Sequence, residues 1–273
     1  MQNSIYGVDI DASAVEITKL RLWLSLISEE EDYSSTEPLP NLDYKIMQGD
    51  SLIDEFFGYK FNIDENKNNQ LNLYDEPSKI DELVKSLNKL QTKYMNLKQF
   101  LKRKEIKKEI ERVILKIFQT AIKNLSNFDN EKFKEFQNKD SFSYKKEKNF
   151  FCWGLFFAEI FYNRKGFDLI IANPPYVEFK LLPKIYKEKL HDYFSAKGKF
   201  DIYVPFTEKC LKLLNENGYA ILIQPTSFLK KNLGKYLRIF LEKKAELISI
   251  HDFNDIQIFS NVTNYTGLFL FRK

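Results

Sequence analysis

Residues 166–179 read GFDLIIANPPYVEF and join an apolar run to a proline-rich turn. Phe167 to Ala172 is a near-continuous apolar run, which is typical of a parallel strand covered on both faces. The run ends directly in Asn173-Pro174-Pro175-Tyr176. Ligands of open α/β sheets bind beyond the carboxyl ends of the strands. We therefore expect this tetrad to lie at a ligand site.

The tetrad offers hydrogen-bond acceptors beside a flat ring. Two consecutive prolines fix the backbone and remove two N–H donors, so their carbonyls stay free to accept. The Asn173 amide oxygen is a further acceptor, and the Tyr176 ring can stack on a planar group. This combination suits an NH2 group on a planar ligand, whose nitrogen then becomes a nucleophile without a general base of its own. The alternative is an ordinary turn, since Asn-Pro and Pro-Pro punctuate loops; the position after an apolar strand favours a functional role.

The flanking sequence alternates strands with helices. Ile5 to Ile10 reads as a buried strand. Residues 14–27 predict a helix that Asp11 or Ser13 can cap and whose apolar residues at helical spacing form a buried face. These apolar residues are Ile17, Leu20, Leu24 and Ile27. The remaining predicted elements are a strand at 44–47 ending in Gly49-Asp50-Ser51-Leu52, a helix or turn at 151–161, helices at 201–214 and 232–244, and strands at 219–224, 247–252 and 265–271.

This order predicts an α/β fold, a doubly wound and mostly parallel sheet. The last two predicted strands have only a short connection without a helix, so one of them must run antiparallel. We expect three parts, residues 1–59, 60–149 and 150–273.

Residues 60–149 are rich in Lys, Asn and Glu and predict a helical, coiled-coil-like insertion. Two apolar seams run through it: Ile80, Leu83, Leu87, Leu90, Tyr94, Leu97 and Leu101, and then Ile106, Ile110, Val113 and Ile117. The spacing fits two antiparallel helices, or one long helix with a stutter near residue 101. The Lys-rich outer face suits contacts with DNA phosphates, but a solvated face on a packed arm is the favoured interpretation.

Composition narrows the class of protein further. The chain of 273 residues has 44% hydrophobic residues, which suits a globular fold, and a net charge of +4, which tolerates a polyanionic partner without proving one. The chain has few cysteines and histidines, and their spacing matches no metal site. They are Cys152, Cys210, His191 and His251. We therefore expect free thiols and no metal. No signal peptide or membrane-spanning run is evident, which predicts a cytoplasmic protein.

Several stretches together resemble the Eco57I-like family of restriction–modification DNA adenine-N6 methyltransferases. They are IYGVDIDASAVEITKLRLWLSL, QGDSLI, FFCWGLFFAEIF, GFDLIIANPPYVEF, KGKFDIYVPFTEKCLKLLNENGYAILIQPTSFLKKNLGKYLRIFL and IFSNVTNYTGLFLF, in the order of the family. The tetrad alone is less specific, because methylases of protein glutamine and of RNA bases share it. The resemblance implies a Rossmann-like class I methyltransferase fold and S-adenosyl-L-methionine as cofactor.

The resemblance also implies roles for individual residues. Asp9 would bind the ribose hydroxyls of the cofactor and Asp50 its adenine amino group, although Asp50 also reads as a turn residue after Gly49. The implied cofactor-binding set is Asp9, Ile10, Asp50, Ser51 and Asn173. The implied catalytic set is Asn173, Pro174, Pro175 and Tyr176, with Asn173 and the Pro174 carbonyl holding the target amine and Tyr176 stacking on the target adenine. Phe259 would pack on the other side of the flipped base, or is an ordinary core residue.

One departure from the family concerns the cofactor. The family has a Gly-containing strand, loop and helix before the position of Asp9, and this chain begins after it, so we expect the first and central strand to be missing. The prediction is an incomplete chain that binds the cofactor weakly or not at all alone. Its expected partners are double-stranded DNA and a second chain or upstream segment. That chain or segment would supply the missing strand and a target-recognition domain. A second copy of the chain is also expected, because it would cover the free sheet edges.

Two alternative functions remain. One is a methylase of a protein glutamine or of an RNA base, and the other is a non-catalytic remnant.

Overall fold

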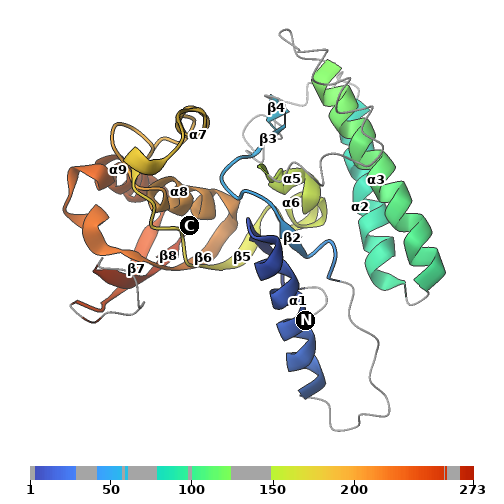
Figure 1. Cartoon of the computed structure of the whole chain (residues 1–273), viewed down its shortest axis with the longest axis horizontal. Helices are drawn as coiled ribbons and strands as arrows, with labels where there is room; N and C mark the ends of the chain where they lie inside the picture. The colour runs from blue at the N-terminus through green and yellow to red at the C-terminus, as the bar shows by residue number, and fades with distance from the viewer. Residues whose placement is uncertain are drawn as a thin grey trace. The chain divides into compact units, whose positions relative to one another are not determined.

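A computed structural model describes residues 4–28, 42–56, 59–60, 79–97, 100–123, 149–254, 256 and 265–273. The chain divides into two compact units, residues 1–162 and 163–273 (Figure 1). The predicted boundaries near residues 60 and 150 stay predictions. Among the described helices, none has the length and apolar character that crossing a bilayer requires.

Unit 1 is built around a short parallel pair of strands. In this pair β1 (Gly7–Asp9) lies beside β2 (Ile46–Gln48), with Asp9 opposite Gln48. The helix α1 (Ala12–Ser28) follows β1, and Val15 on it packs in a small core with Leu42 and Ile46. The Asp11 carboxylate accepts a hydrogen bond from the Ser13 N–H at 2.8 Å, which confirms Asp11 as the N-cap. Two short strands, β3 (Glu55–Phe56) and β4 (Tyr59–Lys60), pair antiparallel after it.

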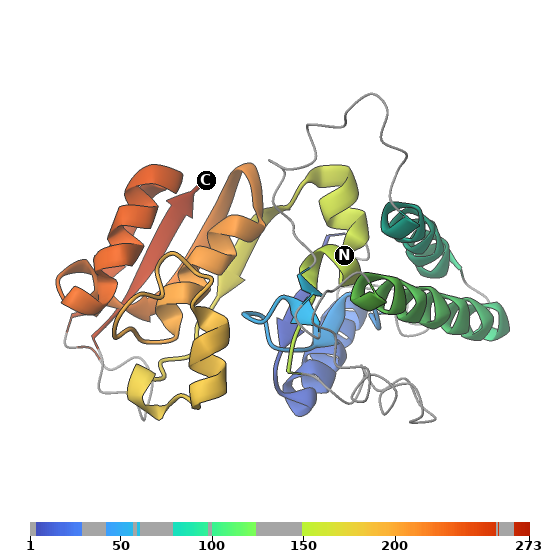
Figure 2. The same ribbon diagram turned by 90° about the horizontal axis from the view of Figure 1, so that it is seen from above.

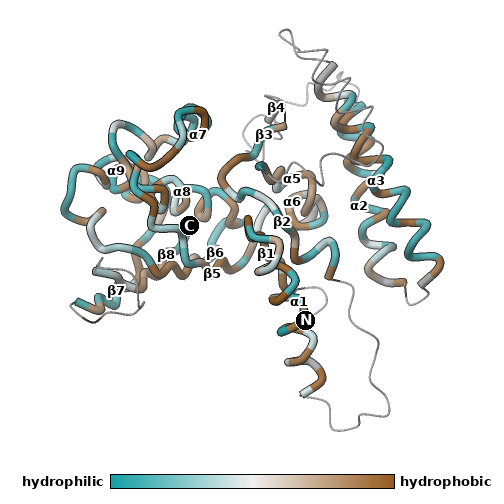
Figure 3. The backbone as a smooth tube through the Cα atoms, in the orientation of Figure 1, coloured by the Kyte–Doolittle hydropathy of each residue, from teal (hydrophilic) through white to brown (hydrophobic). Residues whose placement is uncertain are grey.

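The predicted buried face of α1 is wrong. Ile17, Leu20 and Leu24 are each about half exposed, at 52%, 49% and 50%. β1 is likewise partly exposed rather than buried: Gly7 and Val8 are half-buried and Asp9 is exposed. Figure 3 shows hydrophobic residues along much of α1. The periodicity correctly indicated apolar residues on α1, but in the described part of unit 1 the helix packs through Val15 and Leu22 instead.

The insertion forms a helical hairpin. α2 (Lys79–Asn96) and α3 (Phe100–Lys123) are separate helices that pack against each other, which confirms the two-helix prediction (Figures 1 and 2). Leu87 and Tyr94 of the first seam are buried in α2, whereas Leu101, the second residue of α3, is 76% exposed. In α3 the buried residues are Ile106, Ile110, Ile114, Ile117, Phe118 and Ala121.

An aromatic cluster joins α3 to the rest of unit 1. Phe118 lies fully buried with its ring centre 4.1 Å from that of Phe56 and 6.1 Å from that of Phe150. Phe156 contributes from the short helix α5 (Trp153–Phe156), which precedes α6 (Ala158–Arg164). The hairpin is therefore anchored by the core of unit 1.

Unit 2 contains a mixed four-stranded sheet in the order β5-β6-β8-β7. β5 (Phe167–Ala172) pairs in parallel with β6 (Leu214–Pro225). β8 (Thr266–Arg272) runs antiparallel to both β6 and β7 (Glu246–Asp252). The prediction that one of the last two strands runs antiparallel is confirmed.

Helices cover the face of this sheet that holds the buried residues. The helical elements of unit 2 are η4 (Phe179–Leu181), α7 (Lys184–Leu190), α8 (Tyr203–Leu213), η5 (Thr226–Leu229), η6 (Asn232–Gly234) and α9 (Lys235–Lys244). α8 packs on β6 and α9 on β7. Leu222 and its register partner Phe269 are fully buried, and Gln224 on the same face bonds to Thr207 of α8.

The other face of the sheet is exposed in the described part of unit 2. Leu169 and Ile171 of β5 are 50% and 71% exposed, and Tyr219, the register partner of Leu169, is 40% exposed. The expectation of a strand covered on both faces is therefore wrong for β5 as described here. An apolar run predicts that a strand is suited to burial, but it does not show which element supplies the cover.

Candidate active site

The predicted tetrad lies at the surface of unit 2, directly after the carboxyl end of β5. Asn173 and Pro175 are exposed, Pro174 is buried and Tyr176 is half-buried. β5 ends at Ala172 beside Leu222 of β6, so the tetrad begins where the parallel pairing stops. An exposed amide beside a buried proline leaves polar groups of the tetrad accessible to a ligand.

The Tyr176 side chain is fixed by the neighbouring strand. Its hydroxyl donates a hydrogen bond of 2.9 Å to the carbonyl oxygen of Ile223 near the end of β6. Burial raises the pKa of Tyr176 to about 12. The phenol therefore stays neutral at physiological pH, and the ring is held in a defined orientation.

This burial gives a testable pH dependence. Because the folded-state pKa of Tyr176 lies above the ordinary value of about 10, ionisation favours the unfolded chain, and we expect stability to fall as pH rises from about 10 through about 12. Phenolate absorbance is titrated with pH for the wild type and for Tyr176→Phe, and the second curve is subtracted from the first. The difference should show one phenol that titrates with its midpoint near pH 12. A difference curve centred near the ordinary value would show that this phenol is solvated.

The segment after the tetrad is tied back to the start of α8. The Ile202 N–H donates to the Val177 carbonyl at 2.9 Å, and Glu178 forms an isolated antiparallel bridge with Asp201. Burial, followed by the nearby Glu178 carboxylate, raises the pKa of Asp201. These contacts hold both ends of the loop 177–201 together and limit the freedom of the tetrad.

The sequence did not predict a polar network that links α8 to the end of β6. The Thr207 hydroxyl bonds to the Gln224 side-chain oxygen at 2.6 Å, and the Tyr203 hydroxyl lies 2.9 Å from that of Ser227. All four residues connect α8 with the end of β6 and the turn that follows. Their sequence spacing carries no signal, because the partners are 17 and 24 residues apart.

The predicted cofactor residues of unit 1 end two adjacent parallel strands. Asp9 is exposed at the end of β1, where its carboxylate accepts the Asp11 N–H at 2.8 Å. Ile10 next to it is 63% exposed. The Gly49 N–H donates to the Asp9 carbonyl at 2.9 Å, which brings the turn after β2 against the end of β1.

Asp50 lies in that turn and is buried. It is only 6% exposed, and its carboxylate accepts the Leu52 N–H at 3.0 Å. The Ser51 carbonyl accepts from the Trp153 indole N–H at 3.0 Å. Gly49 is required here, because a Cβ would lie 2.8 Å from the Phe151 ring and 2.9 Å from the Phe150 carbonyl. Asp50 therefore lies in a turn, as the alternative interpretation predicted. The role of Asp50 in cofactor binding stays a prediction.

The predicted site residues do not all fall in one unit. Asp9, Ile10, Asp50 and Ser51 belong to unit 1, and the tetrad belongs to unit 2. Phe259 lies outside the described residues. Within the described ranges, no cluster of His, Cys, Asp and Glu is arranged to hold a metal, and Cys152 and Cys210 are buried thiols.

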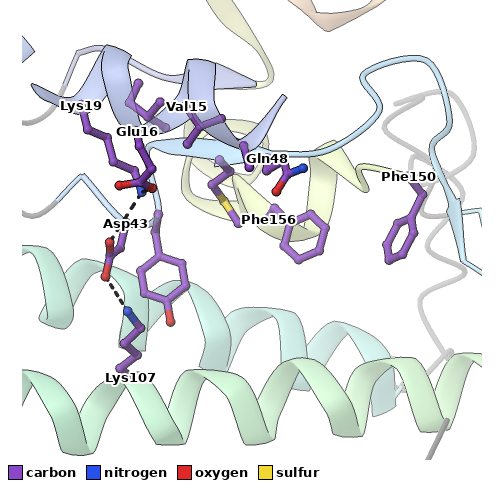
Figure 4. Close-up of a pocket in the computed structure, with 12 residues that line it drawn as sticks. Val15, Glu16, Lys19, Asp43, Gln48, Lys107, Phe150 and Phe156 are labelled. Carbon is purple, nitrogen blue, oxygen red and sulfur yellow. Dashed lines mark hydrogen bonds and ion pairs between the residues drawn. The ribbon is translucent and has the colours of Figure 1, made fainter. Parts of the chain in front are cut away.

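Unit 1 also contains a cavity of about 300 Å³ that the sequence did not predict (Figure 4). It is lined by Ala12, Val15, Glu16, Lys19, Asp43, Tyr44, Ile46, Met47, Gln48, Lys107, Phe150 and Phe156. Asp43 forms ion pairs with Lys19 of α1 and Lys107 of α3. Burial acts in the opposite direction, but these lysines hold the pKa of Asp43 below its usual value. None of the predicted site residues lines this cavity.

Comparisons with known proteins agree with the sequence motifs. The Eco57I restriction-modification methylase family matches residues 3–259. The type II restriction enzyme and methyltransferase RM.Eco57I of Escherichia coli is 40% identical over 114 residues, 39% of this chain and 11% of that protein. RM.MjaORFECS2P of Methanocaldococcus jannaschii, assigned as a type II restriction enzyme and methyltransferase, is 30% identical over 278 residues, 83% of this chain and 22% of that protein.

A solved structure from Listeria monocytogenes, assigned as a class I S-adenosylmethionine-dependent methyltransferase, covers 70% of this chain and 79% of its own, with 12% identity and a TM-score of 0.34. The family match extends over most of the chain, including both units and the tetrad. The chain belongs to the Eco57I restriction-modification methylase family. It spans about a tenth of the length of the Escherichia coli relative and about a fifth of that of the archaeal one.

Proposed function

We propose that this chain is the methyl-transfer core of a DNA adenine-N6 methyltransferase that uses S-adenosylmethionine. Membership of a restriction-modification methylase family supports the reaction class. The observation that carries the proposal is the exposed Asn173-Pro174-Pro175-Tyr176 tetrad at the end of β5, with Tyr176 bonded to the Ile223 carbonyl. Hydrogen-bond acceptors can bind the amino group of a planar base, and the fixed Tyr176 ring can stack on that base.

The hydrogen-bond acceptors of unit 1 suit the nucleoside part of S-adenosylmethionine. A ribose diol and an adenine amino group are hydrogen-bond donors. The matching acceptors are the carboxylates of Asp9, at the end of β1, and of Asp50, in the turn after the adjacent strand β2. The exposed Ile10 offers an apolar surface for a base, and Ser51 follows Asp50 in the same turn. When bound, S-adenosylmethionine supplies an electrophilic methyl group attached to a sulfonium.

The residues of the tetrad would prepare the target amine. The target adenine must leave the duplex to reach an enzyme pocket. The Asn173 side-chain oxygen and the Pro174 carbonyl would accept the two amine hydrogens, which draws the nitrogen lone pair out of conjugation with the ring. The same oxygens would stabilise the positive charge that develops on N6. Tyr176 would stack on the adenine and so offset part of the cost of flipping.

A labelling assay tests the proposed reaction. The full chain is incubated with radiolabelled S-adenosylmethionine in large excess and with duplex DNA, RNA or a protein extract. We expect label in DNA, recovered as N6-methyladenine after digestion. Label in RNA or in protein glutamine instead of DNA would assign a different substrate to the same tetrad, and label in no substrate would contradict transfer by this chain.

A second prediction separates the two acidic residues at the start of α1. Each carboxylate accepts one backbone N–H, from Asp11 onto Asp9 and from Ser13 onto Asp11, so alanine removes a comparable contact in both cases. We expect Asp9→Ala to weaken S-adenosylmethionine binding about 10- to 100-fold, as the loss of a charged hydrogen bond predicts. Asp11→Ala should leave affinity nearly unchanged and cost about 1 kcal/mol of stability through the lost cap. Calorimetric titration measures both affinities, and equal losses would contradict a cofactor role for Asp9.

A further inference from the structure

The positive charge of the chain is concentrated in the α2–α3 hairpin. Residues 79–123 contain 13 Lys and Arg against 5 Asp and Glu, a net charge of +8. The whole chain carries only +4, so the remaining residues together carry −4. A basic segment on an otherwise acidic chain indicates a polyanionic partner for that segment.

The exposed basic residues of α3 form a continuous ridge that winds slowly around the helix. Lys104, Lys108, Arg112 and Lys116 are all exposed and follow one another at i, i+4 spacing. Side chains four apart lie on the same face of a helix, so the ridge places four cations along about 18 Å at steps of about 6 Å. In α2, three exposed lysines repeat the same spacing: Lys85, Lys89 and Lys93.

Both ridges point away from the core of unit 1. The opposite face of α3 holds Ile110 and Ile117, which are fully buried, and Lys107 on the flank pairs with Asp43 (Figure 4). The opposite face of α2 holds Gln91, which donates to the Phe156 carbonyl at 3.1 Å, and Tyr94, whose ring centre lies 5.0 Å from that of Tyr44. Hydrophilic and hydrophobic residues alternate along both helices in Figure 3, as this two-sided arrangement requires.

The ridge on α3 is not used within the described part of the chain. Among those residues, no ion pair involves Lys104, Lys108, Arg112 or Lys116. Glu105 and Glu109 lie beside the ridge and are exposed, but no ion pair with a described residue involves them either. The four cations therefore remain available for an external anion.

We propose that the outer face of the α2–α3 hairpin binds the phosphate backbone of duplex DNA. This inference rests on the proposed function, which supplies DNA as the substrate. A line of evenly spaced cations on a rigid helix matches a regular row of phosphates, and the ridge has mostly lysines, which act as point charges rather than as base readers. The hairpin would position the DNA without reading its sequence.

The salt dependence of DNA binding tests the proposal, because each neutralised phosphate contributes a slope of about −0.9 to log Kobs against log salt. We expect Lys108→Gln/Arg112→Gln to reduce the magnitude of this slope by about 1.8 on duplex DNA of any sequence. A matched pair of exposed cations on α9, Lys243→Gln/Lys244→Gln, should leave the slope unchanged. Glu105→Lys/Glu109→Lys should increase it by a similar amount, which a variant that merely misfolds cannot do.

The outcomes distinguish this inference from the proposed function. Circular dichroism of each variant establishes that the helices remain. If wild type binds duplex DNA and none of the hairpin variants changes the slope, the hairpin proposal is wrong and the methylase proposal stands. If the hairpin pairs alter binding to anionic lipid vesicles but leave the DNA slope unchanged, the ridge serves a membrane instead. If wild type shows no salt-dependent DNA binding at all, both proposals fail.

Discussion

Asn173→Ala is expected to lower the rate of methyl transfer to adenine by about 100- to 1,000-fold, the range found when one preorganised polar group of a charge-stabilising site is removed. The side chain is exposed at the end of β5, and its removal leaves Pro174 and Tyr176 in place. The Tyr176 bond to the Ile223 carbonyl does not involve Asn173, so the ring should keep its position. The loss should therefore appear in the rate, with duplex DNA affinity nearly unchanged.

Asn173→Asp provides the matched control, because aspartate keeps an acceptor oxygen at the same position. With S-adenosylmethionine in large excess, the aspartate variant should retain clearly more activity than the alanine variant. Single-turnover rates with duplex DNA measure the difference. Equal activity of wild type and Asn173→Ala would remove the tetrad amide from the mechanism, whatever the activity of the chain as a whole.

The order and type of the elements in unit 2 could be predicted because its patterns are local. The apolar strand before the tetrad, the helix before β6 and the antiparallel strand near the end of the chain all follow from runs of residues and short connections. Boundaries differ by a few residues; the helix predicted from residue 201 begins at Tyr203, and β6 extends back to Leu214. Such differences reflect local hydrogen bonding that composition does not specify.

Burial was predicted less well, because it depends on partners distant in sequence. The spacing of Ile17, Leu20 and Leu24 correctly indicated one face of a helix, but these side chains are half exposed in the described structure. Ile171 is likewise 71% exposed, although its apolar strand predicted burial. A hydrophobic period identifies a surface suited to burial, and only the tertiary arrangement determines what lies against it.

In the candidate site, too, local features could be predicted from the sequence and tertiary contacts could not. The exposure of Asn173 at a strand end follows from the sequence, since a polar residue and two prolines stop an apolar strand. The anchor of Tyr176 does not, because its partner is the backbone carbonyl of Ile223, which every residue type possesses. The bond between Thr207 and Gln224 likewise depends on how α8 packs on β6.

Phe118→Ala is expected to cost unit 1 about 3–5 kcal/mol of stability, the usual range for truncating a buried phenylalanine. Phe118 is fully buried against Phe56, Phe150 and Phe156, so alanine leaves a cavity where α3 joins the core. Because the hairpin is held by this cluster, its loss should destabilise the hairpin and the unit together. Leu101→Ala, on the same helix at 76% exposure, should change stability by no more than about 0.5 kcal/mol.

Urea unfolding followed by tryptophan fluorescence measures this effect in unit 1 alone. The chain has two tryptophans, Trp23 and Trp153, and both belong to residues 1–162. We expect the fluorescence midpoint to fall to lower urea for Phe118→Ala and to stay at the wild-type value for Leu101→Ala. If the fluorescence transition of Phe118→Ala coincided with wild type while only far-ultraviolet circular dichroism changed, the hairpin would unfold independently. The ridge on α3 would then rest on a separate helical element, because the aromatic cluster would no longer couple it to the core.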